Sequence, residues 1–165
     1  MVMHNDKMDR IIFWTMGSFA SASWLDLVLL TPITLAGIAL LLYHARNLNL
    51  LLTGSDNAQS MGVNVPREQT LLLVTTTLMV AFAVASCGVI GFVGLIVPHA
   101  VRLLIGADNR RLLPIAALAG ALFMLLCDTL ARTLFQPSEL PVGSLTALIG
   151  APLFIYLLCR NKKTP

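Results

Sequence analysis

Few residues in this chain are of the types and spacings that support catalysis or metal binding. His99 lacks a second histidine or a carboxylate at a metal-motif spacing. Cys87, Cys127 and Cys159 lie inside apolar stretches without a paired partner, so we interpret them as small buried or lipid-facing residues rather than redox centres. We therefore expect no catalytic residue, no metal site and no cofactor.

Nucleotide chemistry is not expected either. The phosphate-binding pattern Gly-x-x-x-x-Gly-Lys-Ser/Thr does not occur in the sequence. An intramembrane enzyme would need paired histidines and acidic residues, or a serine with a histidine, on facing helices. His44 and His99 instead fall near the ends of apolar stretches, which makes this alternative weaker. The net charge of +3 gives no argument for nucleic acid.

Arg132 is a charged residue within a long apolar stretch. A charge inside a membrane span is costly and usually has a partner or a role. Asp128 precedes it by four residues, which places both side chains on one face of a helix. A local ion pair that neutralises both charges is one interpretation, and a functional role for Arg132 is the other.

The composition indicates that these residues are positioned by membrane-spanning helices. The chain of 165 residues is 57% hydrophobic and 12% charged, with a mean hydropathy of +0.83, whereas soluble domains contain roughly 25% charged residues. We predict an all-α, polytopic transmembrane helix bundle after an external N-terminal segment, 1–24, that lacks the features of a signal peptide. The bundle, 25–163, has about five spans, at 25–45, 70–87, 89–105, 112–135 and 142–159.

Two observations set the number of spans and their orientation. The apolar run from Thr70 to Ile105 is about 36 residues long, too long for one crossing, and the glycines in its middle predict a hinge. With five crossings, eight arginines and lysines lie on one side and two on the other. The positive-inside rule assigns the eight to the cytoplasm. The polar segment 46–69 and the C-terminus are then cytoplasmic, and the N-terminus faces outward.

We expect the polar segment 46–69 to lie in water or against a soluble partner. Within it, Ala58 and Gly62 are four residues apart. A small residue followed by a glycine allows a tight turn between short helices and a close approach of a partner surface. An ordinary solvated loop is the alternative.

Several motifs along the chain resemble those of one family of permeases. The string Gly88-Val89-Ile90-Gly91-Phe92-Val93-Gly94-Leu95-Ile96-Val97-Pro98-His99-Ala100-Val101-Arg102 is similar to the signature of FecCD-type ABC transporter permeases, around their seventh and eighth spans. This family imports iron-siderophore complexes, haem and vitamin B12 (cobalamin) across bacterial inner membranes. The family's ninth and tenth spans are similar to three motifs here, Asp128–Arg132, Glu139–Gly143 and Gly150–Pro152. Its outer segment, which precedes the sixth span, is similar to Phe13–Phe19 with Ala22–Trp24. The resemblance runs from Phe13 to about Lys163 and corresponds to the C-terminal half of a permease of about ten spans.

The resemblance implies partners and roles for particular residues. The implied partners are a separate ABC ATPase subunit, a periplasmic or lipid-anchored substrate-binding protein, a second permease copy that completes a dimer, and membrane lipid. Two short helices in segment 46–69 would dock on the ATPase, through Asp56, Asn57, Ala58, Gln59, Ser60, Met61 and Gly62. Arg132 would receive an acidic residue of the binding protein. Close helix approach, near the dimer axis, suits Gly88, Gly91, Gly94, Gly143 and Gly150.

The match to one half of a permease leaves the status of the chain open. An outward N-terminus and an odd number of spans are unusual for a complete small membrane protein, so we expect a part of something larger. A truncated gene product, a split permease with a separately encoded N-terminal half, and a nonfunctional remnant are the alternatives. An iron siderophore is the expected substrate, because it is the most abundant class in the family.

Overall fold

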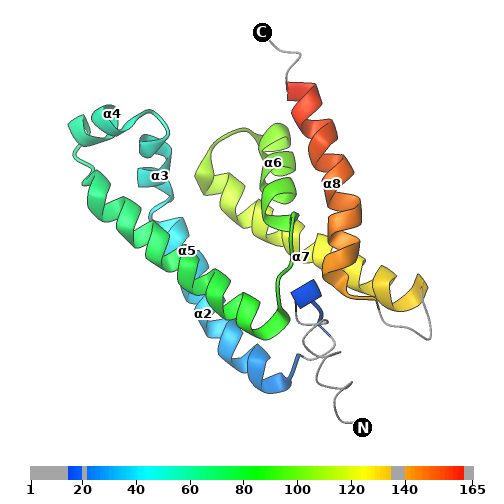
Figure 1. Cartoon of the computed structure of the whole chain (residues 1–165). Coiled ribbons are helices and arrows are strands. Elements are labelled where there is room, and N and C mark those ends of the chain that lie inside the picture. The colour runs from blue at the N-terminus through cyan, green and yellow to red at the C-terminus, as the bar shows by residue number, and fades with distance from the viewer. Residues whose placement is uncertain (1–14, 20–21, 135–139, 162–165) are drawn as a thin grey trace.

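The structure is a computed structural model that describes residues 15–19, 22–134 and 140–161. The helices are α2 (Trp24–Tyr43), α3 (Ala45–Leu51), α4 (Ser55–Ser60), α5 (Val65–Cys87), α6 (Val93–Ile105), α7 (Asn109–Leu134) and α8 (Val142–Asn161) (Figure 1). The predicted fold class, an all-α bundle, is confirmed. Predictions that concern Phe13, Trp14, Glu139, Lys162 and Lys163, and most of segment 1–24, lie outside the described residues.

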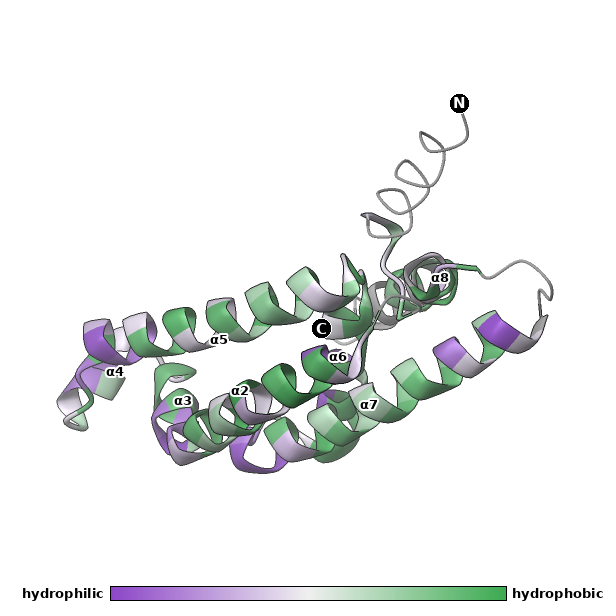
Figure 2. Ribbon diagram, turned by 90° about the horizontal axis from the view of Figure 1, so that it is seen from below, coloured by the Kyte–Doolittle hydropathy of each residue, from purple (hydrophilic) through white to green (hydrophobic). Residues whose placement is uncertain are grey.

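The surface of the bundle suits lipid rather than water. Three helices, α2, α5 and α7, are long and apolar enough to cross a bilayer, and α6 and residues Val142–Ile155 of α8 form shorter apolar helices. Large apolar side chains on them point outward, and Trp24 and Leu104 are 85% and 84% exposed. Figure 2 shows the polar residues gathered towards the ends of the bundle, with mainly hydrophobic helix between them. An apolar surface of this extent is unfavourable in water and matches a bilayer.

The first turns of α2 and α5 are fixed by local capping. Ser23 and Asp26 form a reciprocal capping box, in which Asp26 Oδ2 accepts from the Ser23 N–H at 2.9 Å. The acidic residue near the start of this span is therefore a helix cap. Asn64 Oδ1 accepts from the Arg67 N–H at 3.3 Å, so α5 begins at Val65, ahead of the predicted residue 70. The last polar residues of segment 46–69, namely Arg67, Glu68 and Gln69, therefore lie in the first turns of α5.

The long apolar run is interrupted between Cys87 and Val93, where the chain turns from α5 into α6 (Figure 1). The hinge thus lies in the glycine-containing stretch that predicted it. A segment from the start of the chain satisfies backbone groups here, because the Ser18 N–H donates to the Cys87 carbonyl at 3.0 Å. The Gly17 carbonyl accepts from the Gly143 N–H, near the start of α8, also at 3.0 Å. Residues 17 and 18 therefore join the end of α5 to the beginning of α8.

The interior of the bundle lies between α6, α7 and α8. One cluster consists of Cys127, Ala131, Val142 and Leu145, with Phe123 packed against it. A second cluster, between α6 and α7, consists of Val97, Val101 and Leu112, and Phe123 also contacts it. Helices α2 and α5 form a separate pair, and α2 also contacts α7. Helix α7 therefore has neighbours in both parts of the bundle.

The five glycines predicted to serve helix packing have different environments. The backbone of Gly143 lies against the Met16 carbonyl, and a Cβ at Gly150 would lie 2.7 Å from Phe92 Cβ. Gly88 follows the last residue of α5, and its N–H donates to the Val84 carbonyl at 2.9 Å. A Cβ at Gly91 or Gly94 would meet nothing within 4 Å in the described part of the chain. A role for these two in contact with another chain stays a prediction.

The contact of α8 with α6 predicts an asymmetric response to added methyl groups. Gly150→Ala should lower the thermal unfolding midpoint of the purified protein in detergent, because the new Cβ would lie within 3 Å of Phe92 and Ile96 and overpacking typically costs about 1–3 kcal/mol. Gly120→Ala is the matched control, since a Cβ at this helical glycine would meet only Val97 Cγ1, at an ordinary contact distance of 3.9 Å. Its midpoint should be unchanged or slightly higher. Equal losses for both variants would contradict this packing of α8.

Candidate functional site

The polar segment between α2 and α5 is built from two short helices, not an irregular loop. Helices α3 and α4 stand at one end of the bundle, beyond the apolar helices (Figure 1). We call residues 44–68 the coupling segment, after the expectation, implied by the family resemblance, that short helices in this region dock on an ATPase. Its conformation is set by an internal helix stop, a small core and two polar attachments to the neighbouring helices.

The helix stop is a Schellman motif at the end of α4. The Val63 N–H donates to the Ala58 carbonyl at 3.0 Å, and the Gly62 N–H donates to the Gln59 carbonyl at 2.9 Å. Gly62 has φ +85°, the left-handed conformation that this motif requires and that side chains oppose. Ala58 and Gly62 are thus the third-last residue of the helix and the residue that ends it. This geometry accounts for their spacing of four residues.

Ala58 is the centre of a small core inside the coupling segment. It is fully buried, at 0% exposure, and clusters with Val63, Val65, Leu50 and Leu51. The contact between Ala58 and Val63 is the apolar contact that usually accompanies a Schellman motif. The small side chain is therefore required by packing within the segment, whereas the sequence suggested that it lets a partner approach.

The other six residues predicted to couple to a partner are on the surface: Asp56, Asn57, Gln59, Ser60, Met61 and Gly62. Two of them support α4 itself, because Asn57 Nδ2 donates to the Thr53 carbonyl at 2.8 Å and Ser60 Oγ donates to the Asp56 carbonyl at 2.9 Å. Met61 is 65% exposed, and Leu52, which the sequence did not single out, is 57% exposed. These two are the exposed large apolar side chains at the tip of the coupling segment.

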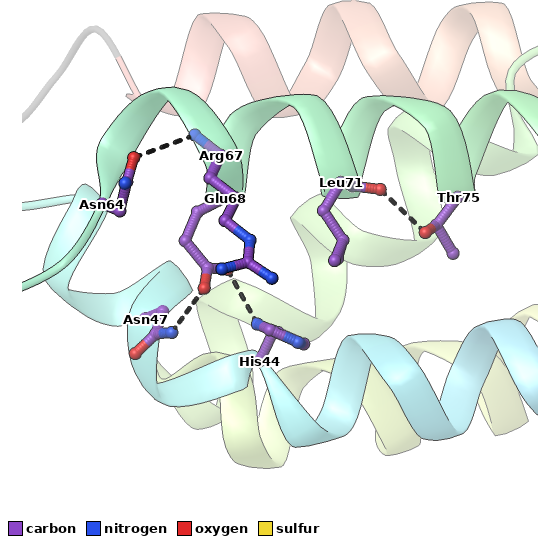
Figure 3. A network of polar contacts seen from close by, with 7 residues as sticks. All are labelled: His44, Asn47, Asn64, Arg67, Glu68, Leu71 and Thr75. Carbon is purple, nitrogen blue, oxygen red and sulfur yellow. Dashed lines mark hydrogen bonds and ion pairs between the residues drawn. The ribbon is translucent and has the colours of Figure 1, made fainter.

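The first polar attachment joins the corner between α2 and α3 to the first turns of α5. His44 Nδ1 lies 2.8 Å from Glu68 Oε2, and Asn47 Nδ2 donates to Glu68 Oε1 at 2.8 Å (Figure 3). The His44 and Glu68 side chains are only 17% and 13% exposed, so solvent competes little for these bonds. One carboxylate therefore holds both ends of the coupling segment together.

The second attachment joins α3 to the turn before α7. Asn49 Nδ2 donates to Asp108 Oδ1 at 2.7 Å, and the Asn109 N–H donates to Asn49 Oδ1 at 2.8 Å. Asp108 also accepts from the Arg110 N–H at 3.1 Å, which caps α7.

The pKa of Asp108 lies below its ordinary value. Its carboxylate accepts hydrogen bonds from the Asn49 amide and the Arg110 N–H, and the charges of Arg111 and Arg110 lie nearby. Because the pKa of Asp108 is lower in the folded than in the unfolded state, the ionised carboxylate stabilises the fold, and this stabilisation is complete above the ordinary carboxyl pKa. It is lost as the pH falls through the lowered one. The attachment is therefore intact at neutral pH.

A groove of about 710 Å³ lies beside the first attachment, between α3 and the start of α5. Its lining includes Arg46, Arg67, Met61 and Leu71. In the described part of the chain, neither arginine has an ion pair within 4 Å. The groove thus offers positive charge and apolar surface next to the tip of the coupling segment.

Arg132 lies at the far end of α7 from these attachments. Its Nε donates to Asp128 Oδ2 at 2.9 Å, which is the local pair that the sequence allowed. The Arg132 side chain nevertheless remains 54% exposed, against 27% for Asp128. The guanidinium can therefore donate to a second carboxylate without losing its local partner.

Residues 1–160 match the FecCD transport family. The chain is a member of the FecCD transport family. Its relatives include the hemin transport system permease protein HmuU of Yersinia pestis, which is 44% identical over 98% of this chain and 48% of its own length. The cobalamin import system permease protein BtuC of Halobacterium salinarum is 48% identical over 89% of this chain and 39% of its own length.

The helix arrangement is also found in a solved structure of a transporter. A metal-chelate type ABC transporter in an inward-facing conformation superposes with a TM-score of 0.85 and 42% identity. The match covers 93% of this chain and 50% of that one. The chain spans about half the length of the relatives it matches.

The Schellman motif of this FecCD chain predicts that a side chain at position 62 destabilises the end of α4. Gly62→Ala should loosen the end of α4, because an L-residue in the left-handed conformation costs about 1–2 kcal/mol. Faster amide exchange at Met61–Val63, with the span amides unchanged, is the expected result. Gly62→Asn is the matched control, since asparagine tolerates this conformation better. Equal exchange in Gly62→Ala and the unsubstituted chain would contradict the motif.

Proposed function

We propose that this chain is a permease subunit of an ATP-driven importer for metal chelates and corresponds to the C-terminal half of such a permease. The observation that carries the proposal is the preorganised coupling segment at the polar end of the bundle, in a chain of this family. ATP is hydrolysed by a separate ATPase chain. An iron-siderophore complex is the favoured substrate class, and haem and cobalamin are the others that the names of relatives suggest.

The coupling segment and the C-terminus face the cytoplasm, in a multi-pass protein of the bacterial inner membrane. The Asn49 attachment supports this orientation, because it brings the coupling segment and the α6–α7 turn to the same end of the bundle. These two connections contain or adjoin five of the seven basic residues in the described part of the chain, namely Arg46, Arg67, Arg102, Arg110 and Arg111. Basic residues gathered at one end are typical of a cytoplasmic face.

The ATPase binds the tip of the coupling segment. Leu52 and Met61 provide exposed apolar contact at the tip, and small clusters of such anchors dominate the energy of many interfaces. The groove with Arg46 and Arg67 adds positive charge beside them. Since the tip is held by the Schellman motif and both attachments, little ordering entropy is lost on binding.

The opposite end binds the substrate-binding protein. Arg132 is exposed at the outer end of α7 and would receive a carboxylate of that protein, with Asp128 as its partner in the free state. A second permease copy completes a dimer, to which Gly91 and Gly94 offer small-residue surface. A separately encoded N-terminal half would supply the remaining spans of a split permease.

Co-purification with the ATPase tests the docking role of the coupling segment. The chain is co-expressed with the ATPase and the remaining subunits of its importer. Met61→Asp or Leu52→Asp should reduce the ATPase retained on the permease about tenfold or more, because loss of an apolar anchor costs about 2 kcal/mol or more. Substrate-stimulated ATP turnover should fall with it.

Thr129→Ala is the matched control, because this exposed residue lies on α7 near the other end of the bundle. It should leave the amount of retained ATPase unchanged. Retention that is unaffected by the Met61 and Leu52 substitutions would remove the coupling segment from the interface. A chain that reaches the membrane and retains no ATPase even without substitution would favour a nonfunctional remnant.

A further inference from the structure

Asn49 connects two parts of the chain that are far apart in sequence. Its side-chain amide donates to Asp108 and accepts from the Asn109 N–H, across 59 and 60 residues. Both functional groups of the amide are thus directed at the first residues of α7. Asn109 is only 8% exposed, so its backbone N–H has little access to water as an alternative partner.

The Asn49 bonds are not needed simply to begin α7. The side chain of Asp108 caps this helix by accepting from the Arg110 N–H at 3.1 Å, and the Asp108 carbonyl accepts from the Leu112 N–H at 2.8 Å. A chain without the Asn49 amide would keep this local cap. What it would lose is the direct polar connection between α3 and α7.

Helix α7 extends from this connection to the other end of the bundle. It continues for 26 residues, from Asn109 to Leu134, which corresponds to about 39 Å at 1.5 Å per residue. Arg132 is in its last turn and is exposed. A displacement of the first turn of α7 therefore reaches Arg132 through one hydrogen-bonded helix.

We propose that Asn49 is the positioning residue that couples the two docking sites. Movement of the coupling segment on the ATPase is delivered through Asn49 to α7 and changes the position of Arg132. In the reverse direction, binding at Arg132 alters the coupling segment, as thermodynamic linkage requires. This inference rests on the proposed function, because it needs an ATPase at one end and a binding protein at the other.

The test measures coupling separately from binding and folding. In the assembled transporter, the affinity for the substrate-binding protein is measured with and without ATP, using an ATPase variant that binds but does not hydrolyse it. The unsubstituted complex should show a ratio of about 5- to 150-fold between the two affinities. Asn49→Ala should bring the ratio close to one when it is measured on complexes that have retained the ATPase, and the unfolding midpoint should stay within a few degrees.

A rescue experiment exchanges the amide of Asn49 and the carboxylate of Asp108, which interact in the structure. Asn49→Asp alone should bring the affinity ratio close to one, because two carboxylates then face each other. Asp108→Asn alone should keep it, since the new amide can still accept from Asn49 and from the Arg110 N–H. The double variant N49D/D108N should restore it, because the donor and the acceptor have changed places.

Two results would overturn the inference, and they are distinguishable. An ATP-dependent ratio that persists in Asn49→Ala and in Asn49→Asp would show that coupling does not pass through Asn49, while the proposed function stands. An unsubstituted chain that binds no ATPase, or no binding protein, would overturn the proposed function and this inference with it.

Discussion

The organisation of this protein depends on the fact that a bilayer has no water to satisfy backbone polar groups. Helices solve this problem internally, and the polar connections must therefore lie at the ends of the bundle or find partners inside the protein. Threonines in the spans follow the same constraint, since Thr75 Oγ1 donates to the Leu71 carbonyl at 2.7 Å and Thr129 Oγ1 to the Leu125 carbonyl at 2.7 Å. In the described part of the chain, no buried side-chain nitrogen or oxygen lacks a partner.

The coupling segment lies beyond the apolar helices and is held by a few specific contacts. It contains too few apolar residues to form a large core, so its conformation comes from specific bonds around one small cluster. The Schellman motif at Gly62, the Glu68 attachment and the Asn49 attachment each fix a different part of it.

Much of the fold could be predicted from the sequence, because its main signals are local. Apolar runs predict the apolar helices, and the break near Gly88 follows from the excessive length of one run. Helix α5 begins at Val65, ahead of the predicted span, because a helix accepts polar residues such as Arg67 and Glu68 in its first turns. Gly91 and Gly94 were grouped with Gly143 and Gly150 by residue type alone, although only the latter two contact another segment closely within the described chain.

The candidate site was less predictable, because its decisive interactions join residues that are distant in sequence. The spacing of Ala58 and Gly62 indicated a tight turn, but the pattern did not show whether Ala58 faces a partner or the interior. Asn49 and Glu68 looked like ordinary polar residues of a solvated segment. Their partners, Asp108 and His44, are 59 and 24 residues away, and no local pattern connects them.

A membrane-impermeant thiol reagent tests most directly whether the coupling segment and the C-terminal end of α7 lie on opposite sides of a bilayer. Single cysteines at Ser60 and Thr133, both exposed, are compared in a chain whose native Cys87, Cys127 and Cys159 are replaced by alanine. In intact cells, Thr133→Cys should react, and Ser60→Cys should react only after the membrane is opened. Labelling of both positions from the same compartment would contradict a bundle that spans the bilayer with the coupling segment on the cytoplasmic side.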